Sequence, residues 1–142
     1  MASPSVVLRQ TDSGFAVRGT VRTLLRLEAL TVAALTIVAY AHVHGNWGLF
    51  AAVWLMPDLS MLGYLINSCW GARSYNTGHT YVLPAVLAGV AYLLHATSLL
   101  PIAIIWTNHI AVDRLLGYGL KYGNAFGWTH FGILGKSKNS TT

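Results

Sequence analysis

The sequence predicts an all-helical integral membrane protein, a bundle of four transmembrane helices joined by short loops. Of the 142 residues, 54% are hydrophobic and only 9% are charged, with a mean hydropathy of +0.52. A soluble domain would carry about 25% charged residues. A membrane span needs about 20 residues, so a chain of this length has room for four spans and little else.

Short polar turns separate four apolar runs, each of which we interpret as a span. The second run contains Pro57, which should kink the helix because it removes a backbone hydrogen bond. The third contains Pro84, and the fourth has Pro101 in its first turn, where proline is tolerated. The expected spans cover about 23–43, 47–66, 75–96 and 99–120.

The ends of the chain are polar. Residues 1–22 should form a cytoplasmic arm, and its scattered arginines argue against a cleavable signal peptide. Residues 123–142 should form an interfacial segment and a cytoplasmic tail. The single cysteine, Cys69, excludes an intrachain disulfide and a cysteine-rich metal site.

The basic residues predict the orientation. All nine lie in the arm, the start of the first span, the second loop, the end of the fourth span or the tail, and the first and third loops have none. The positive-inside rule therefore puts both termini in the cytoplasm, and we expect a multi-pass protein of the cell (inner) membrane. The same rule accounts for the net charge of +5, so we expect no nucleic-acid partner.

Five ionisable side chains fall in the cytoplasmic half of the spans. At about 1.5 Å per residue, Glu28 and His79 lie roughly 6 to 8 Å deep, Asp113 about 10 Å, Asp58 about 13 Å and His109 about 16 Å. His109 and Asp113 are four residues apart and share a helix face. A carboxylate near the bilayer centre costs on the order of 2.5 to 3.5 kcal/mol. These groups must therefore neutralise one another, bind a cation or face water.

A metal site is the leading interpretation. Histidines and carboxylates are ligands of zinc, manganese and iron, and helix bundles build such sites from facing helices. We expect a divalent metal held by His79, His109 and Asp113, with Asp58 as a further ligand or a general base. Glu28 would orient a histidine or accept a proton from metal-bound water, so Asp58 and Glu28 are the catalytic candidates.

Other interpretations remain open. Metal-free acid–base catalysis would suit an isomerase or cyclase acting on an apolar substrate. The same groups would serve a small transporter or binding protein for a cation or protons, and a haem between the two histidines is not excluded. A structural network would instead pair Glu28 with Arg26 or Arg114, and Asp58 with Asn76 or Tyr64.

Further polar residues are candidates for contacts with the substrate or the ligands. Arg114 adjoins Asp113, but helix neighbours point about 100° apart, so it should reach lipid headgroups rather than Asp113. Tyr64 and Tyr118 flank the acidic turns and are potential proton donors. The accessory candidates are Asn76, Tyr64, Tyr118, Arg114 and His130, whereas His42, His44 and His95 should be exposed turn histidines on the outer surface.

Four segments carry a resemblance: 26–30, 57–64, 75–81 and 109–122, with Thr129-His130-Phe131-Gly132 near the end. Together they resemble a bacterial family of small four-helix membrane proteins catalogued as domain of unknown function four-two-six-zero, over about 22–135. More distantly, an Asp in one span, a His-Thr pair and a His-x-x-x-Asp are similar to the YdjM-like membrane-bound metal-dependent hydrolases. That similarity implies a bound metal.

The sequence thus favours a membrane-embedded enzyme, a metal-dependent hydrolase acting on a lipid-like or amphipathic substrate. A transporter needs polar groups that continue to the outer face. The outer halves of the last two spans, 86–94 and 99–105, carry almost none. Membrane lipid and an amphipathic small molecule are the expected partners, with a homo-oligomer as a further expectation.

Overall fold

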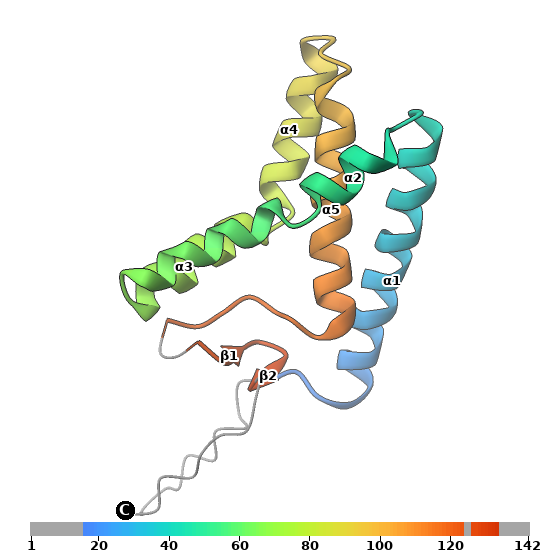
Figure 1. Ribbon diagram of the computed structural model, residues 1–142. Helices are drawn as coiled ribbons and strands as arrows, with labels where there is room; N and C mark the ends of the chain where they lie inside the picture. Colours follow the sequence, from blue (N-terminus) through green and yellow to red (C-terminus); the bar gives the residue numbers. More distant parts are fainter. Residues whose placement is uncertain (1–15, 124–125, 134–142) are drawn as a thin grey trace, which may run out of the picture.

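The computed structural model describes residues 16–123 and 126–133. Figure 1 shows a helical protein with one small β-ribbon. The first fifteen residues of the expected arm and the expected tail from residue 134 lie outside the described residues. The elements are α1 (Gly19–His42), α2 (Trp47–Val53), the 3-10 helix η1 (Met56–Leu65), α3 (Ser68–Gly78), α4 (Val82–Leu93), α5 (Leu99–Leu116), β1 (Trp128–Thr129) and β2 (Gly132–Ile133).

Three helical segments are long and apolar enough to cross a membrane, by length and composition. They are Gly19–His42, Trp47–Leu65 and Leu99–Leu116. The prediction of a helical protein with apolar helices long enough to cross a membrane is thus confirmed. The third expected span differs, because α4 has 12 residues and is therefore only about 18 Å long.

The helix expected over 75–96 is divided between α3 and α4, which are separated by His79–Tyr81. The backbone carbonyls freed at this break are bonded by side chains of α5. The indole Nε1 of Trp106 donates to the carbonyl of Gly78 at 2.7 Å, and Nη2 of Arg114 donates to that of His79 at 3.3 Å. Pro84 lies in the first turn of α4, where its missing N–H has no helical partner to lose.

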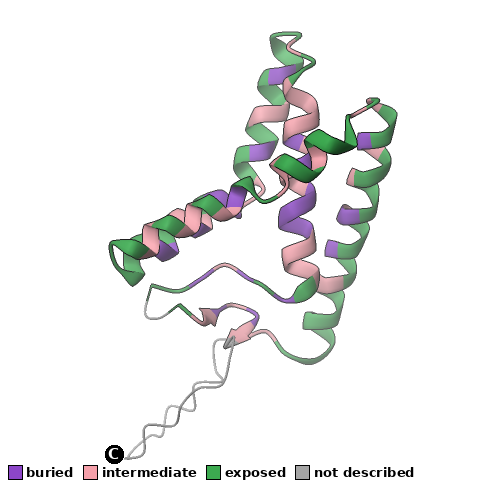
Figure 2. Cartoon of the chain, in the orientation of Figure 1, coloured by how far each residue is buried: buried purple, intermediate pink, exposed green. Residues whose placement is uncertain are grey.

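Helix α5 is the centre of the fold. It packs along α1 and α4 and also touches α2 and η1. In Figure 1, α2 and η1 lead away from the upper end of α1 and cross in front of α5, and α3 then returns alongside η1. Figure 2 shows buried residues concentrated along the middle of α5, among them Ile105, His109 and Ile110. Two polar residues of α5, Asn108 and His109, are thus buried at the centre of the fold.

The second expected span consists of α2 and η1, and Pro57 lies in the first turn of η1. The fourth ends earlier than the expected residue 120, because Gly117 takes a left-handed conformation, with φ of 99°, directly after Leu116. The chain then runs back beneath the helices, where Lys121 pairs with Thr129 of β1 and β1 pairs antiparallel with β2. This ribbon replaces part of the expected interfacial segment.

Candidate metal centre

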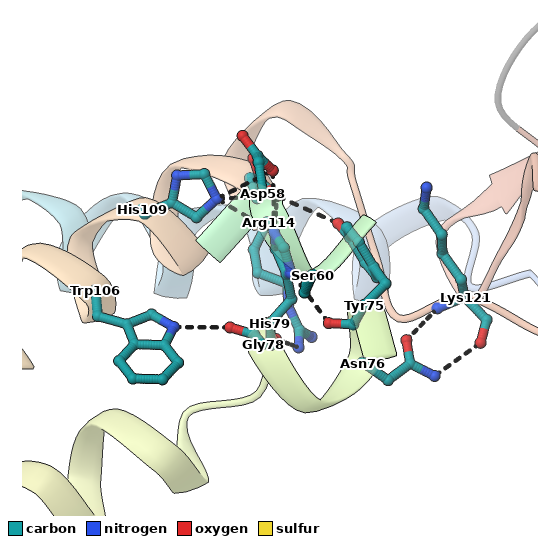
Figure 3. Close-up of polar contacts among 11 residues, drawn as sticks. Asp58, Ser60, Tyr75, Asn76, Gly78, His79, Trp106, His109, Arg114 and Lys121 are labelled. Carbon is teal, nitrogen blue, oxygen red and sulfur yellow. Dashed lines mark hydrogen bonds and ion pairs between the residues drawn. The ribbon is translucent and has the colours of Figure 1, made fainter. Parts of the chain in front are cut away.

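Four side chains from three helical elements meet at one point. Asp58 comes from the first turn of η1, His79 directly follows α3, and His109 and Asp113 lie one turn apart on α5. Each offers one ligand atom, and these four atoms all lie within 4.8 Å of one another. Figure 3 labels three of the four, Asp58, His79 and His109.

The spacing between these atoms is that of a compact coordination shell. Nε2 of His79 lies 3.3 Å from Oδ1 of Asp58 and 3.5 Å from Oδ2 of Asp113. Nε2 of His109 lies 3.6 Å and 3.9 Å from the same two oxygens, and the two Nε2 atoms are 3.2 Å apart. A tetrahedral metal with bonds of about 2.0–2.1 Å separates its ligand atoms by about 3.3–3.4 Å. The four ligand atoms therefore fit a single ion without large movements.

The group is closed on its histidine side and open on its carboxylate side. The side chains of His79 and His109 are 3% and 1% exposed, against 17% for Asp113 and 39% for Asp58. The ring of Tyr75 stacks on His79 with centroids 3.8 Å apart, and Trp54 meets His109 edge-on at 4.8 Å. Water or a substrate can thus reach the carboxylates while aromatic rings cover the imidazoles.

The hydrogen bonds of His79 determine its tautomer. Its Nδ1 donates to the backbone carbonyl of Tyr75 at 3.0 Å, with Oγ of Ser60 at 3.4 Å. In a neutral imidazole the Nε2 atom then carries a lone pair and faces the cluster. Nδ1 of His109 is different, because it is buried and has no hydrogen-bond partner among the described residues.

A second polar contact holds the helices together beside the cluster. Asn108, which precedes His109, donates through Nδ2 to the carbonyl of Ala33 at 3.1 Å and to the hydroxyl of Thr36 at 2.9 Å. Its Oδ1 accepts from the indole of Trp54 at 2.9 Å. One amide therefore ties α1, α5 and the end of α2 together, which places His109 relative to the other helices.

Glu28 and Arg114 lie apart from the four-residue cluster. Glu28 is exposed on α1, is not among the grouped side chains, and lines a separate cavity together with Arg114 and His130. Arg114 bonds the carbonyl of His79 instead of a carboxylate. The network considered from the sequence differs as well, because no ion pair joins Glu28 to Arg26 or Arg114 within 4.0 Å in the described residues.

The remaining accessory candidates are also placed away from the ligand atoms. Asn76 bonds the backbone of Lys121 through both its amide nitrogen and its oxygen. Tyr64 packs edge-on against Phe126, and its buried hydroxyl has no partner among the described residues. Tyr118 is 45% exposed and donates no hydrogen bond within the described part of the chain. Nδ1 of His130 accepts from the amide of Leu120 at 2.9 Å.

Two residues next to the cluster were not singled out from the sequence. Tyr75 precedes His79 by four residues, a spacing that could have revealed their shared helix face. Lys121 was interpreted only as an orientation signal, but its Nζ lies 4.4 Å from the ring centre of Tyr75 and 3.7 Å from that of Phe126. Burial lowers the pKa of Lys121, against the attraction of Asp113 and Asp58. This buried cation adds positive potential near the two carboxylates.

A family model described as "Domain of unknown function (DUF4260)" matches residues 22–134, which include the whole cluster. The chain belongs to this family. The predicted resemblance to the DUF4260 family is thus confirmed, and the more distant similarity to YdjM-like hydrolases stays a prediction. No curated protein and no solved structure matches the chain. The family description states no reaction, so the chemistry has to be argued from the cluster.

Proposed function

We propose that this DUF4260 protein is a membrane-embedded, metal-dependent hydrolase that acts on a lipid-like or amphipathic substrate. Asp58, His79, His109 and Asp113 would hold one divalent cation. The observation that carries the proposal is the approach of all four ligand atoms to within 4.8 Å of one another. The protein would lie in the inner membrane with both termini and this site toward the cytoplasm, as the basic residues predict.

The charges of the cluster favour a cation. Two carboxylates and two imidazoles converge, and the lone pair on Nε2 of His79 faces Nε2 of His109 at 3.2 Å. A divalent ion would neutralise both carboxylates and remove the repulsion between them. Two nitrogen and two oxygen ligands suit zinc, manganese or iron.

Such an ion supplies a Lewis acid and an activated water, which is the chemistry of hydrolysis. Asp58 is the more exposed carboxylate and would either complete the ligand set or take up the proton of the water. Tyr75 would hold Asp113 through its hydroxyl. We assign Glu28 no part in this centre, because it lies in a different cavity.

An apolar cavity next to Asp58 supports a substrate with a hydrocarbon part. It has a volume of about 390 Å³ and is lined by Val53, Met56, Pro57, Ile102 and Trp106. Pro57 directly precedes Asp58, so a chain lying in this cavity would end beside the open carboxylate side of the cluster. The cavity walls offer almost nothing to a polar molecule.

A second candidate function, metal-free acid–base catalysis, is favoured by one observation. A histidine that binds metal through Nε2 donates its other N–H to an acceptor, and Nδ1 of His109 has none among the described residues. If Nε2 of His109 instead donates its proton to Nε2 of His79, Nδ1 is an unprotonated nitrogen. The pair would then share a proton beside two carboxylates, an arrangement that suits the proton transfers of an isomerase or cyclase.

Metal analysis separates these two functions. The full-length protein, purified in detergent without chelators, should contain about one equivalent of zinc, manganese or iron. His109→Ala should lose it, whereas the control His95→Ala, which changes an exposed turn histidine, should keep it. Metal content far below one equivalent in the unaltered protein, even after dialysis against each ion, would contradict the metal-dependent function. Metal-free acid–base catalysis by the histidine pair would then be the remaining candidate.

A further inference from the structure

A second polar cavity lies between α1, α5 and the β-ribbon, separate from the metal cluster. Its volume is about 180 Å³, which corresponds to about six water molecules at about 30 Å³ each. The polar side chains that line it are Glu28, Tyr81, Arg114 and His130, and its remaining walls are apolar. Four separate segments of the chain thus contribute one polar group each.

The charged side chains that line this cavity are not paired with each other. Every ion pair within 4.0 Å in the described residues belongs to the metal cluster, so Glu28 and Arg114 line one cavity but do not bridge it. Arg114 uses Nη2 for the carbonyl of His79 and has further N–H groups. His130 accepts at Nδ1 from Leu120, so its Nε2 carries the proton of the neutral ring. The cavity therefore offers donors for an anion and one carboxylate for a cation.

An apolar groove of about 340 Å³ continues from this cavity between α1, α4 and α5. The two share Val32 and Tyr81 as lining residues. Along α5, Arg114 marks the polar end and Ala103 the apolar end, a separation of about 16 Å at 1.5 Å per residue. On α1, Glu28 and Thr36 mark the same two ends in the same direction.

We propose that the polar cavity and the apolar groove together bind one phospholipid, whose headgroup carries both a phosphate and a primary ammonium. The phosphate would accept hydrogen bonds from Arg114 and His130, the ammonium would meet Glu28, and one acyl chain would lie in the groove. A zwitterion is the headgroup that satisfies both opposite charges of the cavity, and a hydrocarbon chain fits a groove with nearly no polar lining. The proposal does not depend on the metal centre or on hydrolysis.

Native mass spectrometry of the full chain released from dodecyl maltoside tests this. Phosphatidylethanolamine should bind at one site with a Kd at least tenfold lower than that of phosphatidylglycerol, which has the phosphate but no ammonium. Free O-phosphoethanolamine should bind far more weakly than the lipid, because it lacks the chain. Equal affinity for the two lipids would overturn the zwitterionic headgroup, and equal affinity for lipid and free headgroup would overturn the groove.

Glu28→Gln is the decisive variant, because it removes the charge that meets the ammonium and lies on the exposed face of α1. It should abolish the preference for phosphatidylethanolamine while leaving phosphatidylglycerol binding and metal content unchanged. Arg114→Gln should weaken both lipids, and the exposed Arg73→Gln on α3 serves as a matched control that should weaken neither. An unchanged lipid preference in Glu28→Gln would refute the proposal, whatever the metal analysis gives.

Discussion

The hydroxyl of Tyr75 donates a hydrogen bond of 3.2 Å to Oδ2 of Asp113, a side chain from a different helix. The ring of Tyr75 stacks on the imidazole of His79, with ring centroids 3.8 Å apart and an interplanar angle of 12°. One tyrosine thus orients a carboxylate from α5 and an imidazole that follows α3. Groups that orient ligands in this way typically change metal affinity about 10- to 100-fold when removed.

Tyr75→Phe should therefore weaken metal binding about tenfold while keeping the ring stack and the fold. The measurement is competition for zinc with a chelator of known affinity, together with a circular dichroism spectrum. Tyr118→Phe is the control, because Tyr118 is 45% exposed and donates no hydrogen bond in the described residues. Equal zinc affinity of both variants and the unaltered protein would show that the Tyr75 hydroxyl does not support the ligand.

Asn76→Ala should loosen the segment that follows α5. Nδ2 of Asn76 donates to the backbone carbonyl of Lys121 at 2.8 Å, and Oδ1 of Asn76 accepts from the backbone N–H of Lys121 at 2.7 Å. Each backbone group left without a partner costs about 1–3 kcal/mol, so amide exchange at Lys121 should accelerate at least fivefold. Thr77→Ala is the control, because the exposed Thr77 hydroxyl bonds only the carbonyl of Arg73 within α3. Unaltered exchange at Lys121 in Asn76→Ala would contradict the assignment.

Acid should destabilise the ribbon through His130. Burial, and then the neighbouring Arg114, lower the pKa of His130 below its usual 6.5. The unfolded chain therefore binds this proton at a higher pH than the folded chain, so stability falls as the pH drops below about 6.5. The thermal midpoint should fall less between pH 7.5 and 5.5 in His130→Gln than in the unaltered protein. The exposed His95→Gln should keep the full dependence, and an identical fall in all three proteins would rule out His130 as its source.

Cys69 tests the orientation. It is exposed and lies near Arg73 in α3, on the side that the positive-inside rule assigns to the cytoplasm. An impermeant maleimide should label it in inverted membrane vesicles and leave it unlabelled in intact cells. Labelling in intact cells would reverse the assigned orientation of the whole chain.

The meeting of Asp58, His79, His109 and Asp113 could be anticipated from the sequence, because unpaired charges in apolar helices need partners and all four fall in the cytoplasmic half of the expected spans. The depth of each side chain was estimated from the rise per helical residue alone, so the estimate did not require the packing of the helices to be known. Glu28 met the same criterion and was placed with them. Depth does not specify which way a residue faces on its helix, and Glu28 lines a separate cavity together with Arg114 and His130.

The break between α3 and α4 could not be predicted in the same way. The run 81–94 is apolar throughout, so composition gives no sign of where a helix begins. Pro84 was placed in mid-span, whereas it occupies the first turn of α4. What decides between these positions is the pair of bonds from Trp106 and Arg114 to the carbonyls of Gly78 and His79, and such contacts are visible only in three dimensions.

Those two bonds have a consequence for the order in which the protein is made. Helix α5 supplies both donors to the broken backbone and two of the four ligand candidates, and it leaves the ribosome after the other helices in the described residues. Until it is inserted, the carbonyls of Gly78 and His79 lack these partners in lipid, a cost of several kcal/mol that α5 removes on docking. Asp58 and His79 alone make at most half a binding site. Under the proposed function, metal capture would therefore wait until synthesis has passed residue 116, and a nascent chain stalled earlier would hold no metal.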